Sequence, residues 1–266
     1  MKAVGTIRPS GMNRAWTRIG SSTNSGRDMS FSNKRYDAVT LDMGFTLVNL
    51  EGSTHRDLLA ALAAEAGLTL TLDDVRRAIR AFWREWTAEN ATRVWHPSLA
   101  QDQASSYEID QQICLRLGIT DPALHAEANR RSEAIFHDLA TFQVFPEVFE
   151  ALTTLRTQVE TLGILSNWGW RLPELCAALG LADYFDFIIT SARIGAAKPH
   201  PNIFRAALAR AASDPARTLH VGDDLAADVH GAQALGITGV LLDRHGAITP
   251  DGFPVVHSLT EVVTLL

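Results

Sequence analysis

The chain has 266 residues, of which 46% are hydrophobic and 20% charged, and its formal net charge is −6. This ordinary globular composition excludes collagen-like, coiled-coil and wholly disordered chains, and two cysteines are too few for a disulfide framework or a cysteine-based zinc cluster. No apolar run approaches the ~18 residues of a membrane span, and the acidic balance argues against nucleic acid held by bulk attraction. We therefore expect a cytoplasmic protein with no membrane or nucleic-acid partner, built as one large domain or as a domain with an insertion. The sequence leaves its oligomeric state open.

The first 35 residues differ from the rest of the chain. They hold seven basic residues and one acid, whereas residues 36–266 hold 17 basic and 29 acidic residues. They are rich in Ser, Gly and Asn, and they lack the apolar stretch of a secretory signal. We exclude residues 1–35 from the fold. Their composition leaves open a disordered tail, a transit peptide, or a start assigned upstream of a true start at Met29.

From Tyr36 onward the chain alternates short apolar runs with amphipathic helical patterns. The first run, 36–44, is apolar and β-branched and stops at Asp42 and Gly44, which is typical of a buried strand ending in a loop. Further strands are predicted over 160–167, 185–192, 217–224 and 237–244, and helices over 145–158, 170–180, 201–212 and 225–236. This alternation predicts an α/β fold, a Rossmann-like parallel sheet with helices on both faces. Sites in such sheets form beyond the carboxyl ends of the strands.

A different region, 53–141, separates the first predicted strand from the second. Its apolar residues recur at helical spacing, and no strand pattern interrupts it. Helices are predicted over 54–67, 72–90, 99–117 and 122–139. Because an insertion of about 90 residues is too long for a simple connection, we predict an all-helical cap domain above the carboxyl edge of the sheet. The core is then 36–52 with 142–266, and its links to the cap lie near 47–53 and 141–146.

Polar and charged residues collect where the predicted strands end. They are Asp42 and Thr46 after the first strand, Ser166 and Asn167 after the second, Lys198 after the third, and Asp223, Asp224 and Asp228 after the fourth. In a parallel sheet all of these side chains meet at one edge. Crowded carboxylates repel one another unless a cation lies among them, and carboxylates with carbonyl oxygens suit Mg²⁺. Such a site, with a lysine and a hydroxyl nearby, suits a phosphoryl group that a carboxylate attacks in line.

The ordered set of motifs resembles the haloacid dehalogenase superfamily of aspartyl-nucleophile phosphohydrolases. LDMGFTL resembles its first motif, ILSN its second, Lys198 within GAAKPHPNIF its third and HVGDDLAAD its fourth. The helical insertion follows the first motif, as in family members with a C1 cap. The resemblance covers 36–266 and implies a phosphatase-type hydrolase of a small phosphorylated substrate, with Mg²⁺ as its cofactor.

The resemblance also implies a role for each matching residue. Asp42 attacks phosphorus and ligates Mg²⁺, and Ser166 donates a hydrogen bond to the transferring phosphoryl group. Lys198 neutralises charge on that group and on Asp42. Asp223 is an acidic Mg²⁺ ligand, and Asp228 supports the metal site.

Three further residues are assigned to substrate binding. Thr46 orders the loop after the nucleophile, and Asn167 and Trp168 follow the second motif. Trp168 either lines the substrate pocket or packs under the cap, and the sequence does not decide between the two.

The chain departs from the family pattern at Gly44. Phosphatases of the family usually carry a second Asp at this position, which protonates the leaving oxygen and then activates water. The family ligates Mg²⁺ through the backbone carbonyl here, and glycine retains that carbonyl. The chain therefore keeps its expected metal ligand at Gly44 but lacks general acid/base catalysis, which contributes about 10²–10⁴-fold.

Three alternatives to a phosphatase follow from this departure. Haloacid dehalogenases also lack the second Asp and need no metal, but the acids around Asp223 favour a metal site. Phosphonatases lack it too, but residues 47–141 contain no lysine that could form a Schiff base. The leading hypothesis is therefore a Mg²⁺-dependent hydrolase of a small phosphorylated metabolite. Its main rival is a catalytically weak or inactive member that binds a phosphorylated ligand or a protein partner.

Overall fold

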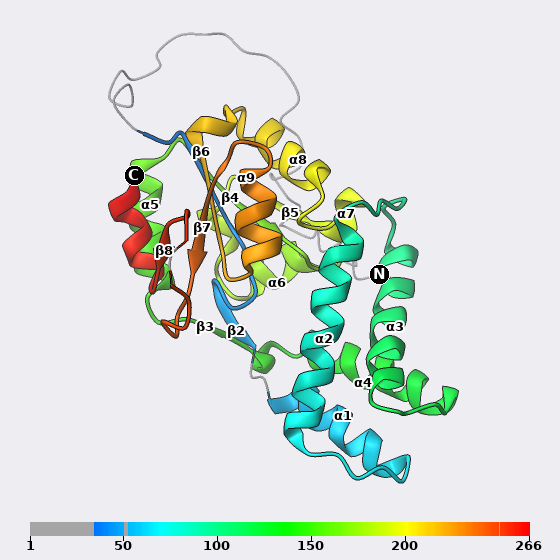
Figure 1. Ribbon diagram of the computed structural model, residues 1–266. Coiled ribbons are helices and arrows are strands. Elements are labelled where there is room, and N and C mark those ends of the chain that lie inside the picture. Colours follow the sequence, from blue (N-terminus) through cyan, green and yellow to red (C-terminus); the bar gives the residue numbers. More distant parts are fainter. Residues whose placement is uncertain (1–34, 51–52, 250) are drawn as a thin grey trace, which may run out of the picture. The chain divides into compact units, whose positions relative to one another are not determined.

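The core of the protein is a six-stranded parallel sheet in the order β5-β4-β1-β6-β7-β8 (Figure 1). The computed structural model describes residues 35–50, 53–249 and 251–266, so the predicted leader lies outside the described residues except for Arg35. The strands are β1 (Ala38–Leu41), β4 (Thr161–Ser166), β5 (Phe187–Thr190), β6 (Thr218–Gly222), β7 (Thr238–Leu242) and β8 (Val255–Val256). All five predicted strands are present, and the α/β prediction is confirmed.

Apolar side chains alternate between the two faces of this sheet and pack against helices on each. On one face, Leu162 and Ile164 of β4 share an apolar cluster with α5 (Val148–Gln158), α6 (Leu172–Ala178) and the 3-10 helix Leu259–Leu265. On the other face, Leu165 of β4 packs with Phe204 of α8 (Pro201–Ala211) and with α9 (Gly231–Gln233). Because both faces are covered, the strands are mostly apolar, with Thr40 of β1 and His220 of β6 as buried polar residues within them.

The region between the core segments is helical, as the sequence predicts. It contains α1 (Ser53–Glu65), α2 (Leu72–Asn90), α3 (Leu99–Arg116) and α4 (Pro122–His137), which enclose an apolar cluster of their own. Thr71 caps α2 in a reciprocal capping box with Asp74. We call residues 53–141 the helical insertion; its status as a separate cap domain, with the boundaries given above, stays a prediction.

The two links to the insertion are strands, which the sequence analysis did not predict. β2 (Val48–Leu50) precedes the insertion and pairs antiparallel with β3 (Phe142–Val144), which follows it. The backbone N–H of Phe145 also donates to the carbonyl of Leu47 at 3.1 Å. The chain therefore leaves the core and returns to it at neighbouring points.

Two further differences concern the end of the chain. The helix predicted over 225–236 is instead a π-helical turn, Leu225–His230, followed by the short α9. β8 and the 3-10 helix at Leu259–Leu265 were not predicted, because a two-residue strand and a seven-residue helix carry too little periodicity. Among the described residues, no helix has the length and apolar character needed to cross a membrane.

Candidate active site

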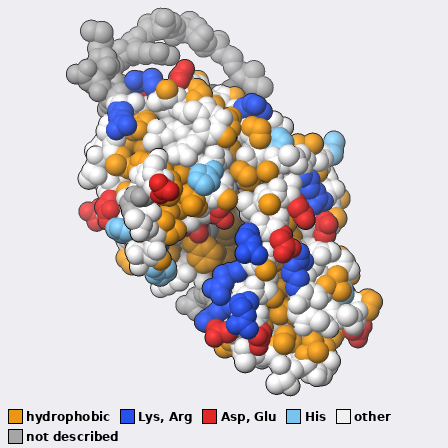
Figure 2. Space-filling model, viewed as in Figure 1, with side chains coloured by type: hydrophobic (Ala, Val, Ile, Leu, Met, Phe, Trp, Pro, Cys, Tyr) orange, Lys and Arg blue, Asp and Glu red, His pale blue; other side chains and the backbone are white. Residues whose placement is uncertain are grey.

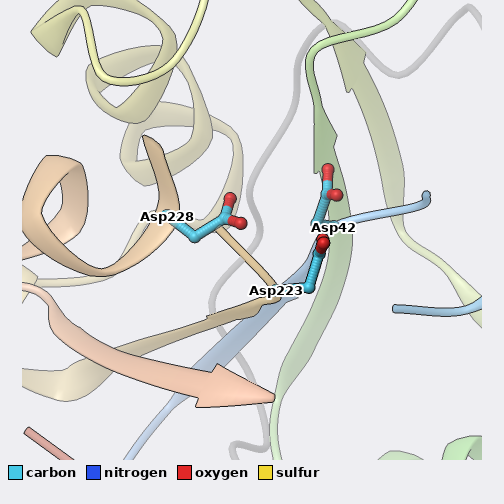
Figure 3. Close-up of side chains that lie close together, drawn as sticks. All are labelled: Asp42, Asp223 and Asp228. Atoms are coloured by element: carbon cyan, nitrogen blue, oxygen red, sulfur yellow. The ribbon is translucent and has the colours of Figure 1, made fainter. Parts of the chain in front are cut away.

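The carboxylates predicted to hold a metal ion lie together at the carboxyl edge of the sheet. Asp42 follows β1 directly, and Asp223 follows β6, which pairs with β1. Asp228 projects toward both from the helical turn after β6 (Figure 3). One carboxylate oxygen of each residue lies within 4.8 Å of the other two. Acids at this separation repel one another unless positive charge lies among them.

Lys198 supplies part of that charge. The residue is buried in the loop between α7 (Ser191–Ile194) and α8. Its Nζ donates to Asp42 Oδ1 at 2.7 Å, to Asp228 Oδ1 at 2.5 Å and to the Leu165 carbonyl at 2.9 Å. These contacts use all three donors of an ammonium group. Burial alone would lower the pKa of Lys198, but the carboxylates of Asp228 and Asp42 raise it above its usual value, so the side chain is charged.

Asn167 fixes the backbone of this lysine. Its side-chain nitrogen donates to the carbonyl of Lys198 at 2.9 Å, and its Oδ1 accepts from the N–H of Lys198 at 2.7 Å. The peptide bond between Lys198 and Pro199 is cis. The structure thus shows Asn167 as a side chain that positions the lysine, and its role in substrate binding stays a prediction.

His220, which the sequence analysis did not single out, is a fully buried member of the cluster. It lies in β6, with Nε2 3.0 Å from Asp228 Oδ1 and Nδ1 2.9 Å from the hydroxyl of Thr40. Burial alone would raise the pKa of Asp228, but the charge of Lys198 and the hydrogen bond with His220 hold it well below its usual value. Asp228 is therefore an ionised partner that keeps the lysine in place.

The backbone next to β6 makes room for this carboxylate. Asp228 Oδ2 accepts from the N–H of Asp224 at 3.0 Å. A Cβ on Gly222 would lie 2.1 Å from the Asp228 carboxylate, so only glycine permits this approach. The predicted part of Asp228 in metal binding stays a prediction, since its contacts are with the protein.

The positive charge of Lys198 does not offset the burial of the other two acids, Asp42 and Asp223. Burial raises the pKa of Asp42, as does the charge of Asp228, and these effects outweigh Lys198 and a hydrogen bond from Ser166. Burial and then the charges of Asp42 and Asp228 raise the pKa of Asp223 well above its usual value, although this residue keeps partial contact with solvent. Three carboxylates thus share one ammonium group. A hard divalent cation bound by oxygen ligands fits this donor set.

The loop after Asp42 folds back on itself. The N–H of Phe45 donates to the carbonyl of Val48 at 2.7 Å, and the N–H of Val48 donates to the carbonyl of Met43 at 3.1 Å. Phe45 has φ = +52°, in the left-handed region that non-glycine residues rarely occupy, and its ring is exposed. Thr46 is buried, and its hydroxyl has no hydrogen-bond partner among the described residues.

Arg244, two residues after β7, holds this loop from the side. Its Nε donates to the carbonyl of Phe45 at 3.1 Å and its Nη2 to the carbonyl of Thr46 at 2.8 Å. Its Nη1 donates to Glu147 Oε1 at 2.6 Å, and the guanidinium group stacks 3.6 Å from the centre of the Phe145 ring. Arg244 therefore joins the nucleophile loop to the segment between β3 and α5. The sequence carries no signal for this role, because the targets of Arg244 in the loop are backbone carbonyls.

Trp168 lies beside the position of the missing acid. A Cβ built on Gly44 would lie 3.4 Å from Cζ3 of Trp168 and 3.8 Å from Leu50 Cδ1. The indole also contacts the ring of Phe142, with centroids 5.9 Å apart. Trp168 thus packs between the nucleophile loop and β3, and its predicted role in substrate binding stays a prediction.

Comparisons with known proteins agree with this arrangement. Residues 36–236 match the family model for the haloacid dehalogenase-like hydrolases. Haloacid dehalogenase-like hydrolase domain-containing protein 3 of Mus musculus is 36% identical over 129 residues, which is 47% of this chain and 51% of that protein. The chain thus spans about half the length of this curated relative.

Two further proteins are similar over larger shares of their own lengths. Pyrimidine 5′-nucleotidase YjjG of Escherichia coli is 32% identical over 54% of this chain and 66% of its own length. The structure of YfnB from Bacillus subtilis, described as a HAD hydrolase bound to magnesium, has a TM-score of 0.67 at 21% identity and covers 87% of this chain and 99% of its own. The motif order, the fold and the family match lead to one conclusion: this chain belongs to the haloacid dehalogenase-like hydrolases.

Proposed function

We propose that this protein is a Mg²⁺-dependent phosphohydrolase that acts on a small phosphorylated molecule through an aspartyl-phosphate intermediate. The observation that carries the proposal is the Asp42 carboxylate, which lies at the end of β1, 2.7 Å from Lys198 Nζ, within a cluster of three acids. Relatives named as a phosphoserine phosphatase, a nucleotidase and a bisphosphate phosphatase support this class of reaction. We also expect the protein in the cytoplasm.

In this proposal each residue of the cluster has a distinct task. Lys198 binds Oδ1 of Asp42, which leaves Oδ2 to attack phosphorus. The new O–P bond forms on Asp42 as the bond to the leaving oxygen breaks, and water then releases phosphate from the aspartyl group. Ser166 lies at the end of β4 to bind a phosphoryl oxygen.

The metal site comprises Asp42, Asp223 and the carbonyl of Gly44, with Asp228 as its support. When bound, Mg²⁺ neutralises charge on the phosphoryl oxygens and on the acids around it. The fit rests on the chemistry of the donors, because three carboxylates share a single lysine.

A specific observation favours a second candidate, a weak or inactive phospholigand-binding protein. Gly44 provides no general acid, and Trp168 crowds the space into which such an acid would extend. An active enzyme of this design should therefore prefer leaving groups that need no proton. Acyl and aryl phosphates leave as stable anions, whereas sugar phosphates leave as alkoxides that require protonation.

The test is a panel of acetyl phosphate, p-nitrophenyl phosphate and sugar monophosphates, assayed with Mg²⁺ and with EDTA. We expect Mg²⁺-dependent turnover of the first two and turnover of the sugar phosphates lower by about 10²–10⁴-fold. Asp42→Asn is the control, since it removes the anionic nucleophile at nearly constant shape. Turnover that survives this substitution would refute the covalent mechanism. Tight phosphate binding without any turnover would favour the binding protein.

A further inference from the structure

Helix α2 presents positive charge that the protein itself does not neutralise. Its four arginines, Arg76, Arg77, Arg80 and Arg84, are all exposed. Arg76 pairs with Asp73, and Arg77 pairs with Asp74. Among the described residues, Arg80 and Arg84 have neither an ion pair nor a hydrogen bond. In a chain of net charge −6, two adjacent unpaired arginines are available to a ligand.

The spacing of these arginines places them on one side of α2. Arg76, Arg80 and Arg84 are four residues apart and form one row along the helix. Arg77 and Glu85 line a shallow groove against Arg116 of α3, and Arg80 and Arg84 are not among its lining residues. Arg80 and Arg84 therefore lie outside that groove.

Contacts made by the links to the insertion, by the segment after α2 and by α3 hold the insertion at the carboxyl edge of the sheet. The β2–β3 pair joins the insertion to the loop after Asp42. Beyond α2, the N–H of Trp95 donates to the carbonyl of Gly195 at 2.8 Å, and Asp102 of α3 accepts from the N–H of Trp170 at 2.8 Å. Gly195 and Trp170 lie in loops that follow β5 and β4. These contacts fix the insertion beside the site from two directions.

The surface agrees with this placement. Figure 2 shows basic side chains gathered over α2 along a hollow that lies between the insertion and the sheet. Because residues 47–141 contain no lysine, the basic side chains of the insertion are arginines. The hollow thus has arginines on its insertion side.

The charges within the site explain why a second phosphate group of a substrate needs the arginines of the insertion. The charge of Lys198 is used within the site, since its Nζ donates to Asp42, Asp228 and the Leu165 carbonyl, so a second phosphate group needs positive charge from elsewhere. A guanidinium group binds phosphate in a bidentate manner. Two arginines one helical turn apart lie about 6 Å from each other along the axis, which matches a single phosphate group held between them.

From these observations we infer that Arg80 and Arg84 bind a second phosphate group of the substrate, so that the preferred substrate is a small bisphosphate. This inference rests on the proposed function, in which Asp42 receives the first phosphoryl group. In this inference the arginines of the insertion select the substrate class, whereas the residues at the edge of the sheet carry out the reaction.

The experiment measures binding separately from turnover. Isothermal titration calorimetry with Mg²⁺ compares fructose 1,6-bisphosphate and fructose 6-phosphate on the full chain carrying Asp42→Asn, which prevents hydrolysis. We expect the bisphosphate to bind about tenfold more tightly, as one additional charge-assisted contact allows. Arg80→Gln with Arg84→Gln should reduce the preference to less than about twofold. Arg130→Gln, an exposed arginine of the insertion that lies on α4 and pairs with Glu127, should leave it unchanged.

The outcomes separate this inference from the proposed function. Equal affinity for the two sugars, no binding of the bisphosphate, or a preference that survives the double substitution would each overturn the arginine site. Turnover of p-nitrophenyl phosphate by the protein with Asp42 intact is measured in parallel. With both arginines intact, equal affinity for the two sugars together with normal turnover would reject only the inference. A clear preference for the bisphosphate without turnover would reject only the phosphatase.

Discussion

The ring of Trp168 borders the space into which a side chain at position 44 would grow, since a Cβ on Gly44 would lie 3.4 Å from Cζ3 of the indole. That distance is at the short end of ordinary contact, so a methyl group fits but the carboxylate of an Asp would have to turn away from the indole or displace it. Glycine at position 44 and tryptophan at position 168 are therefore coupled, because the indole borders the space that an aspartate side chain at position 44 would need.

We predict that Gly44→Asp alone gives little gain in sugar-phosphate hydrolysis, and that Gly44→Asp with Trp168→Ala gives a gain approaching 10²-fold or more. The second substitution opens the space that the carboxylate needs. Steady-state kinetics on a sugar phosphate and on p-nitrophenyl phosphate measure the effect, with Trp168→Ala alone as control. If Gly44→Asp alone gave the full gain in sugar-phosphate hydrolysis, the prediction would be wrong, because the indole of Trp168 would then move aside without substitution.

Mg²⁺ should stabilise the fold through Asp223. A ligand that binds only the native state stabilises it by about 2.7 kcal/mol at a concentration 100 times Kd, which corresponds to a shift of roughly 5–10 °C in Tm for a chain of this size. Asp223→Ala should abolish the shift, while Asp186→Ala, at the amino end of β5 beside Arg156, should keep it. Melting curves with EDTA and with millimolar Mg²⁺ provide the measurement. Identical curves for the unmodified protein would count heavily against the metal site.

Arg244 should influence catalysis without touching substrate. Arg244→Lys keeps the charge, but a single ammonium group cannot bind the carbonyls of Phe45 and Thr46 and the carboxylate of Glu147 at the same time. The nucleophile loop therefore loses its fixed geometry. We expect kcat for acetyl phosphate to fall by about tenfold or more, with KM changed much less.

The matched control for this prediction is Arg217→Lys. Arg217 pairs with Asp37 at the opposite, amino end of the strands, far from the loop in sequence and topology. Equal losses of kcat in the two variants would assign the effect of Arg244 to general stability. The Mg²⁺ dependence of Tm gives a second readout, since a displaced loop also moves the carbonyl of Gly44.

Asp102 should make stability depend on pH. Burial raises the pKa of this carboxyl group, so the folded state binds its proton more tightly than the unfolded state does. Its contribution is then most favourable below the unfolded value, near 3.8, and declines as the pH rises through the folded value. Asp102→Asn retains an oxygen for the N–H of Trp170 and removes the buried charge.

We therefore expect Asp102→Asn to raise Tm at pH 7 and to have almost no effect near pH 4. Asp102→Ala removes the acceptor as well and should lower Tm at both pH values, because the N–H of Trp170 is left without a partner, which costs about 1–3 kcal/mol of unfolding free energy. Thermal melts across this pH range test both variants. A lower Tm for the asparagine variant at pH 7 would mean that the charge of Asp102 stabilises the contact with the core.

The sequence predicted the sheet because its signals are local. Each core strand is an apolar run between turn residues, and the right-handed crossover rule then brings Asp42, Ser166, Lys198 and Asp223 to one edge. The short strands β2 and β3 were missed, because three residues have no measurable period and their pairing joins segments about 90 residues apart.

The residues that support the site were harder to find for a related reason. His220 does leave a signal, since it is a polar residue inside an otherwise apolar strand, eight residues before its partner Asp228. Arg244 leaves none, because it binds the backbone carbonyl of Thr46, 198 residues away, and any residue there offers the same carbonyl. Asn167 is predictable as a site residue, but only the structure shows that its amide binds the backbone of Lys198.

The pairing of β2 with β3 has a consequence for the evolution of such a protein. Since Leu50 pairs with Phe142, removing everything between the two strands would leave the two chain ends on neighbouring positions of the ladder. A segment joined in this way can be lengthened, replaced or exchanged without reordering the sheet. In the substrate site that we infer on α2, mutations would alter which molecules are accepted while the acids and the lysine stay where they are, so recognition and chemistry would evolve separately within one chain.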